Sequence, residues 1–144
     1  MDYIDANLLP DETVVHRATL HWLIFGKAML VVALGVGLLA VEPTVGALVS
    51  VVGLVMSLPA WIAYKTSEFG VTTKRVIVKV GLVQRRTLEL LLRQVEAIAV
   101  DQSIMGRMFN YGSVTLSGTG GVREVFHDIA APLEFRRKIQ SQTV

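Results

Sequence analysis

Two long apolar stretches dominate the first half of the chain. Residues 22–41 contain one charged side chain, Lys27, and residues 45–64 contain none. Each stretch has the roughly 20 residues that a helix needs to cross the hydrocarbon core of a bilayer. Glu42, Pro43 and Thr44 separate them, and proline cannot continue a helix interior. The pattern predicts a transmembrane hairpin of two helices over residues 20–65.

Two other interpretations of these stretches are disfavoured. A signal peptide has a shorter apolar core near the N-terminus, whereas the first stretch here is long and follows an acidic lead. Two buried helices of a soluble protein would rarely be so free of charge over two adjacent 20-residue windows.

After residue 65 the apolar residues change from continuous runs to alternation, which is typical of strands. We expect strands at 68–72, 75–80, 83–90, 95–102, 112–117 and 122–129. A turn is expected at 92–94, a helical or irregular connector at 103–110 and a hairpin turn at 118–121. Residues 90–100 also contain many helix-favouring side chains, but we favour the turn and strand. A final helix is expected at 132–142, with Phe135 and Ile139 on one apolar stripe.

These elements predict an α+β chain with three parts. Residues 1–19 form an N-terminal lead, 20–65 the transmembrane hairpin, and 66–144 a β-rich domain capped by the C-terminal helix. The three parts carry net charges of −3, +1 and +4. Basic residues lie before the first apolar stretch and after the second. The short loop between the two stretches has only one charged residue, Glu42. The positive-inside rule therefore predicts that both termini are cytoplasmic and that the protein is multi-pass.

Composition narrows the possible chemistry. The chain has no cysteine, which excludes disulfides, thiolate metal sites and cysteine nucleophiles. His16 and His21 are five residues apart, which is not the spacing of a helical metal site, and His127 is remote in sequence. Residues 118–121 (GTGG) lack the ending of a phosphate-binding loop. We expect no enzyme activity, cofactor, metal or catalytic residue, and the weak net charge argues against a nucleic-acid partner.

Five basic residues lie close together in sequence around one expected hairpin of the β-rich domain. Anionic lipid headgroups attract such side chains by about 1 kcal/mol each near a membrane surface. The alternative is that these residues form a solvated strand face and only help to keep the membrane orientation of the protein. The candidate headgroup contacts are Lys74, Arg75, Lys79, Arg85 and Arg86.

The order of short motifs resembles the bacterial pleckstrin-homology-like membrane proteins, a family formerly listed as a domain of unknown function. The motifs run almost the whole length of the chain: LLPDE at 8–12, TSEF at 66–69, VTTKRVI at 71–77, KVGLV at 79–83, VEAI at 95–98, QS at 102–103, GR at 106–107, YGSV at 111–114, GTGG at 118–121 and IAAP at 129–132. The resemblance implies a strongly bent antiparallel sheet or barrel closed by a C-terminal helix. It also implies a tendency to form homo-oligomers, and it implies no settled activity.

The resulting expectation is a non-enzymatic, membrane-anchored module at the bacterial inner membrane. It would act as a scaffold by assembling with itself or with a membrane protein partner. An anionic-lipid-binding or lipid-sensing module is the alternative. A small channel or transporter subunit is a third possibility, which the nearly uncharged apolar stretches make less favourable.

Overall fold

A computed structural model describes residues 2–81 and 84–144 and divides the chain into two compact units. One unit combines Met1–His21 with Thr66–Val144, and the other is Trp22–Lys65. Composition and charge predict residues 1–19 to be a separate lead. The structure instead includes them in the β-rich unit, because they form a strand and a helix that pack on its sheet.

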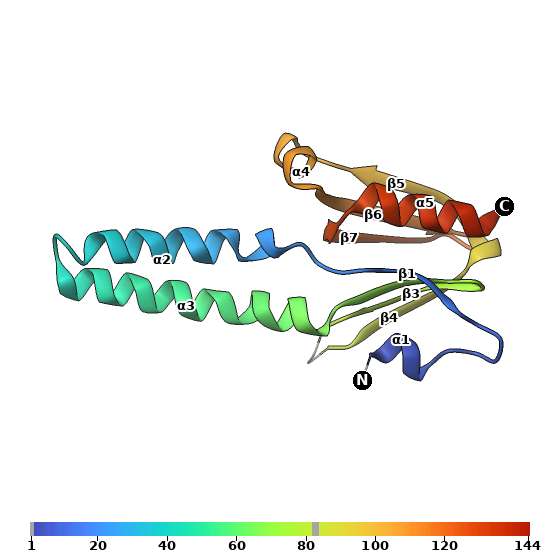
Figure 1. Ribbon diagram of the computed structural model, residues 1–144, viewed down its shortest axis with the longest axis horizontal. Helices are drawn as coiled ribbons and strands as arrows, with labels where there is room; N and C mark the ends of the chain where they lie inside the picture. Colours follow the sequence, from blue (N-terminus) through green and yellow to red (C-terminus); the bar gives the residue numbers. More distant parts are fainter. Residues whose placement is uncertain (1, 82–83) are drawn as a thin grey trace. The chain divides into compact units, whose positions relative to one another are not determined.

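The unit formed by Trp22–Lys65 is a helical hairpin. It contains a 3-10 turn, η1 (Trp22–Phe25), followed by α2 (Gly26–Leu38) and α3 (Pro43–Thr66) (Figure 1). Pro43 is the first residue of α3, and the helix continues through Pro59. Both helices lie where the apolar stretches predicted them. Only α3, with 24 residues and a mean hydropathy of 2.1, is long and apolar enough to cross a membrane by length and composition among the described helices.

Glycines allow α2 and α3 to approach closely. A Cβ atom on Gly35 would lie 2.5 Å from the backbone nitrogen of Ser50, and one on Gly53 would lie 2.7 Å from that of Val32. The Ser50 hydroxyl donates a hydrogen bond to the Gly46 carbonyl within its own helix, at 2.8 Å. The large apolar side chains point away from this contact, and Leu30 and Leu48 are 73% and 64% exposed. The two helices therefore contact each other through small residues and expose their large apolar side chains.

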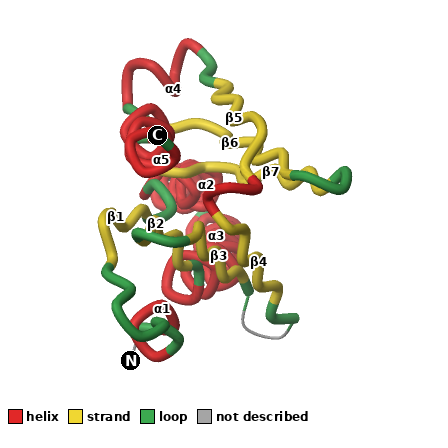
Figure 2. Tube along the Cα trace, turned by 90° about the vertical axis from the view of Figure 1, so that its right-hand side faces the viewer, coloured by secondary structure: helices red, strands yellow, loops and turns green. Residues whose placement is uncertain are grey.

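The other unit contains two antiparallel sheets. The first has the order β1 (Val14–Ala18), β2 (Glu68–Thr72), β3 (Arg75–Val80) and β4 (Arg86–Leu91). The second has the order β5 (Val95–Asp101), β6 (Tyr111–Gly118) and β7 (Val122–Ala130). Figure 2 shows these strands in yellow. All six expected strands are present. The one expected at 83–90 is β4, which begins at Arg86, and residue 83 of that expectation lies outside the described residues.

Strand β1 was not expected from the sequence, and it determines where the hairpin is inserted. Ala18 pairs with Phe69 and Val14 pairs with Thr72, so β1 and β2 are antiparallel neighbours. The whole of Trp22–Lys65 is thus the connection between two adjacent strands. After β1 the chain continues to β7, where Leu20 forms a bridge with Ile129. Residues 14–20 therefore bond to both sheets.

Three short helices and a C-terminal helix complete the described part of this unit, and the first of them is α1 (Tyr3–Ala6). The short turn η2 (Leu92–Gln94) joins β4 to β5, as expected for 92–94, and α4 (Ile104–Phe109) fills the expected connector. Helix α5 (Pro132–Thr143) packs on the β-structure, and its Phe135 and Ile139 are fully buried, which confirms the predicted apolar stripe. Inside, the ring of Phe69 meets that of Phe126 edge-on at 5.7 Å. The fold is α+β, with two antiparallel sheets and a C-terminal helix.

Candidate interaction surfaces

The strand register separates the five basic residues of the sequence prediction into two groups. Glu68 pairs with Lys79 and Val80 pairs with Arg86, so Lys79, Arg85 and Arg86 lie at the end of the sheet where β2 begins. Lys74 and Arg75 lie at the opposite end, in and after the β2–β3 turn. About five residues of strand, or roughly 15 Å, separate the two ends. The five residues therefore do not form one patch.

Arg75 belongs to the interior of the unit and not to its surface. Its guanidinium contacts both carboxylate oxygens of Glu12, with Nε to Oε1 at 3.0 Å and Nη2 to Oε2 at 3.1 Å. Glu89 accepts a further hydrogen bond from Nη1, and the Asn7 carbonyl accepts one from Nη2 at 2.6 Å. The side chains of Arg75 and Glu12 are only 9% and 0% exposed. These contacts hold Arg75 to the N-terminal segment, which disfavours the headgroup contact expected at this residue.

The ion pair is held by further hydrogen bonds that act on the pKa of Glu12. Burial alone would raise that pKa, but the hydrogen bonds outweigh it. They come from Arg75, from the Thr72 hydroxyl at 2.6 Å and from the Leu9 amide at 2.7 Å. The net result is a pKa of Glu12 below its ordinary value. The hydrogen bond to Glu12 raises the pKa of Arg75, so both groups are charged at neutral pH.

Lys79 helps to dock the N-terminal helix α1 (Tyr3–Ala6). The Glu68 carboxylate accepts hydrogen bonds from the amides of Tyr3 and Ile4, at 3.1 and 3.2 Å. The Lys79 ammonium lies 3.7 Å from that carboxylate and 5.4 Å from the centre of the Tyr3 ring. Ile4 is almost fully buried and packs against Gly70, where a Cβ atom would clash with its side chain. The Lys79 ammonium thus already interacts with Glu68 and Tyr3 within the fold.

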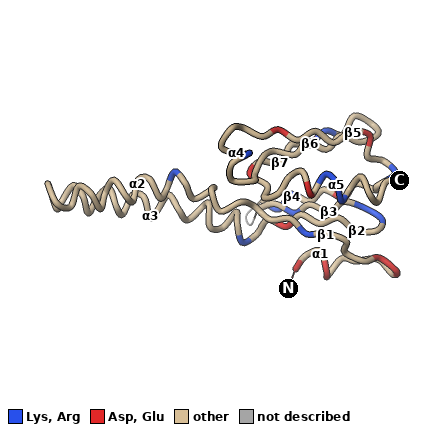
Figure 3. The backbone as a smooth tube through the Cα atoms, turned by 45° about the horizontal axis from the view of Figure 1, so that its top comes forward, with Lys and Arg blue, Asp and Glu red and all other residues tan. Residues whose placement is uncertain are grey.

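The remaining three basic residues of the prediction are exposed. Lys74 donates a hydrogen bond to the Pro10 carbonyl at 2.8 Å, and Arg86 pairs with Glu124 on β7. Arg85 directly precedes β4. Figure 3 shows that charged residues are spread over the β-rich unit, whereas the tube through α2 and α3 is mostly free of them.

The three histidines lie in different surroundings. The ring of His16 meets Phe135 at 6.4 Å, and that of His21 stacks on Tyr111 at 5.1 Å. His127 Nδ1 is 3.0 Å from the Ser113 hydroxyl on the neighbouring strand, in an exposed place. Among the described residues no group of three or more histidine, aspartate or glutamate side chains is arranged to hold a metal ion.

Helix α4 exposes a group of apolar side chains that the sequence analysis did not identify. Ile104, Met105 and Met108 are 82%, 53% and 72% exposed, and Arg107 beside them is exposed as well. The Ser103 hydroxyl caps the helix by accepting from the Gly106 amide at 3.0 Å, and Asn110 ends it in the left-handed conformation. The sequence does contain a signal for this surface. The short connector has three large apolar residues, although the strands on either side already provide the apolar core.

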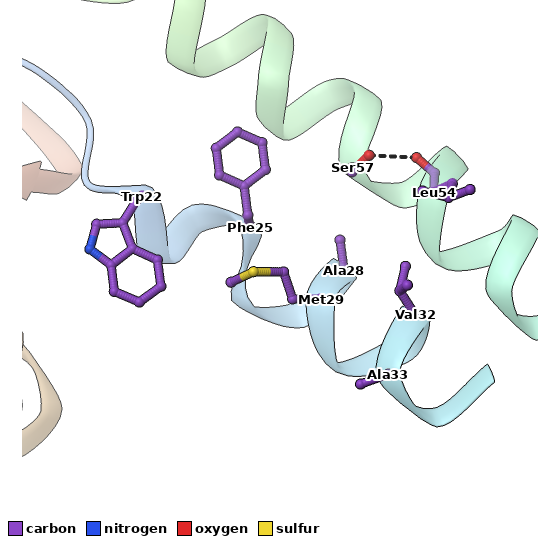
Figure 4. A pocket seen from close by; sticks show the side chains of 8 residues that line it. All are labelled: Trp22, Phe25, Ala28, Met29, Val32, Ala33, Leu54 and Ser57. Carbon is purple, nitrogen blue, oxygen red and sulfur yellow. Dashed lines mark hydrogen bonds between the residues drawn. The ribbon is translucent and has the colours of Figure 1, made fainter. Parts of the chain in front are cut away.

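The hairpin has an apolar groove on its surface. It has a volume of about 600 Å³ and is lined by side chains from η1, α2 and α3. Trp22, Phe25 and Met29 lie on one side, and Leu54 and Ser57 on the other (Figure 4). The one hydroxyl, that of Ser57, already donates to the Leu54 carbonyl at 2.6 Å. The groove therefore offers a mainly hydrocarbon surface.

Comparisons with known proteins give one family and one solved structure. A family model described as "Bacterial PH domain" matches residues 23–143. A crystal structure of a DUF1696 family protein with a pleckstrin-homology domain, from Shewanella loihica PV-4, has 12% sequence identity and a TM-score of 0.44. The match covers 54% of this chain and 71% of that one. A search of curated proteins gives no match.

Proposed function

The chain belongs to the bacterial PH domain family, and from this premise we propose that it is a non-enzymatic scaffold anchored in the bacterial inner membrane. The helical hairpin is the anchor, and the PH-like unit presents an open sheet edge to a second copy or to a membrane protein partner. The observation that carries the proposal is the insertion of an outwardly apolar hairpin between two paired strands.

The side-chain distribution of the hairpin supports a lipid environment. Its internal contact is made by glycines, while Leu, Val and Met side chains face outward and are about half exposed or more. Water disfavours such a surface by about 25 cal/mol for each Å² of apolar area. Helix α3 is about 36 Å long, enough to cross a hydrocarbon core of about 30 Å. The helical segment Trp22–Leu38 is shorter than α3, and a local thinning of the bilayer would accommodate it.

Charge near the hairpin supports one orientation. Arg17 and Lys27 precede or begin the first helix and Lys65 ends the second, whereas the loop between the helices carries only Glu42. Basic residues near the ends of spans are retained in the cytoplasm. Both termini, and with them the PH-like unit, are then cytoplasmic.

Strand β5 is the surface that we assign to assembly. It pairs with β6 on one side, and among the described residues no strand pairs with its other side. None of its residues is buried, and its sequence, VEAIAVD, favours strand pairing. An uncovered, apolar edge strand is a template for another strand. A second copy or a partner's extended segment could add to the sheet there.

Two measurements test the proposal. The full-length protein should remain with membranes after extraction with alkaline carbonate; release into the supernatant would contradict the anchor. In detergent it should run as a discrete oligomer that Ala99→Lys, on the exposed side of β5, dissociates. Ala6→Lys, the same change at an exposed alanine of α1, should leave the oligomer intact. A monomer at all concentrations would contradict assembly.

An anionic-lipid-binding role is the second candidate. The observation that favours it is the position of Lys79, Arg85 and Arg86 at the end of the sheet where the chain continues from the hairpin into β2. Two of these cations have acidic partners, which weakens their attraction for headgroups. Arg85→Glu combined with Arg86→Glu should reduce the anionic lipid that copurifies with the full-length protein. An unchanged lipid content would exclude this role for the two arginines.

A further inference from the structure

We propose that helix α4 is a second membrane contact, which inserts Ile104, Met105 and Met108 into the boundary between headgroups and acyl chains. Three large apolar side chains that are 53–82% exposed lie on one short helix, and the spacing of four and three residues places Ile104 and Met105 next to Met108. On the surface of a soluble domain, a group of exposed apolar side chains is typical of a binding site. The proposal rests on the membrane anchoring proposed above and adds a second site of lipid contact outside the hairpin.

The position of α4 within the β-rich unit favours a lipid surface as its binding partner. Tyr111, two residues after the helix, stacks on His21 at 5.1 Å. The amide of His21 donates to the Asp128 carbonyl at 2.7 Å, which fixes His21 at this end of β7. The next residue in the chain, Trp22, begins the apolar hairpin. A helix of six residues is about 9 Å long, so all of α4 lies near the point where the chain leaves for the membrane.

The local chemistry fits interfacial insertion better than electrostatic adsorption. Isoleucine and the flexible methionines supply apolar area, while Arg107 can reach a phosphate oxygen. Asp101, at the end of β5, and Asp128 are exposed acids nearby, so the net local charge does not attract an anionic surface. The contact is therefore driven by apolar area, and it should persist at high salt.

The helix is also preformed for this contact. Ser103 caps its first turn, and the side-chain amide of Gln102 donates to the Tyr111 carbonyl at 3.2 Å, which ties both ends of the connector together. A helix that is already ordered loses little conformational entropy when it inserts.

The test uses the full-length protein in vesicles of phosphatidylcholine and phosphatidylglycerol. Because the chain has no cysteine, single variants can carry an environment-sensitive fluorophore, with nitroxide-labelled lipid as the quencher. Met108→Cys reports on α4 and Leu48→Cys on the hairpin. Val122→Cys is the matched control, since it is exposed and apolar but lies at the other end of β6 and β7, about 23 Å from Tyr111.

The proposal expects lipid quenching at Met108 and Leu48, little at Val122, and no change at Met108 when salt is raised. Quenching at Leu48 with none at Met108 would overturn the α4 contact and leave the anchor intact. No quenching at either position would overturn both. An apolar environment at Met108 that develops only at high protein-to-lipid ratio, without lipid quenching, would assign α4 to a second copy and also overturn the proposal.

Discussion

At the scale of single residues, the partner of a charged side chain decides its role. Arg75 stands in a run of basic residues, and nothing local distinguishes it from Lys74. Its partner, Glu12, comes from the other side of the hairpin in sequence, 63 residues away. Local pattern could predict that both residues are charged, but not that the N-terminal segment returns to cover the sheet. The candidate site was therefore predicted less well than the strands that carry it.

Removing Arg75 should destabilise the β-rich unit strongly. Arg75→Met leaves the carboxylate of Glu12 buried and without its cation, and breaking such a pair costs about 3–5 kcal/mol of unfolding free energy. Lys74→Met, at the exposed neighbour, should change it by less than about 0.5 kcal/mol. Chemical denaturation of the full-length protein in detergent, followed by circular dichroism, measures both. Equal stability of the two variants would show that the buried pair contributes little.

Acid should weaken the same contact. The pKa of Glu12 is lower in the folded state than in the unfolded state, so its contribution to stability is present at neutral pH. That contribution declines once the pH falls below the unfolded value of about 4.5. The wild type should therefore lose unfolding free energy more steeply between pH 5 and pH 3 than Glu12→Gln, which lacks the ionisable group. Parallel pH profiles for the two proteins would contradict a lowered pKa at Glu12.

At the scale of elements, period and turn residues predicted most of the β-rich unit. Strands β2, β3, β5, β6 and β7 and helix α5 follow from alternation, glycine turns and a proline at a helix start. Strand β1 was missed because it has five residues, stands directly before a long apolar stretch and gains its stability from β2, which comes 50 residues later in the chain. Propensity does not report such a remote partner.

Within the hairpin, two glycines of one helix should respond differently to the same change. A Cβ atom on Gly35 would overlap the backbone of Ser50, whereas one on Gly37 meets nothing within 4 Å. Gly35→Ala should destabilise the α2–α3 contact by about 1–3 kcal/mol. Gly37→Ala should leave it unchanged or stabilise the helix by about 0.5–1 kcal/mol. Titration of the protein with a denaturing detergent, followed by helical circular dichroism, compares the two, and equal loss would contradict the close contact.

At the scale of the whole molecule, the chain is a PH-like unit interrupted by a hairpin between its first two strands. The sequence suggested a linear order of lead, hairpin and domain, because composition changes abruptly at residues 20 and 65. The pairing of Ala18 with Phe69 shows that the chain returns to the strand that it left. The PH-like unit is therefore tied to the hairpin by two strands and not by one flexible linker.

This topology predicts which fragments fold. Residues 1–21 joined to 66–144 by a short glycine-serine linker should give a soluble, cooperatively folded domain, since the linker only has to connect two paired strands. Residues 66–144 alone lack β1, the Glu12 partner of Arg75 and the bridge to β7, and should be unfolded or aggregated. Dispersed amide signals in the NMR spectrum would distinguish the two. Equally well-folded fragments would mean that residues 1–21 are dispensable.

The most direct test of a PH-like unit anchored by an inserted hairpin is cysteine accessibility in intact bacterial cells. Thr44→Cys lies at an exposed position in the first turn of α3, next to the loop from α2, and Gln140→Cys lies on the exposed side of α5. A membrane-impermeant maleimide should label Thr44→Cys in intact cells and Gln140→Cys only after permeabilisation. Labelling of Gln140→Cys in intact cells, or protection of Thr44→Cys until the membrane is opened, would contradict the account.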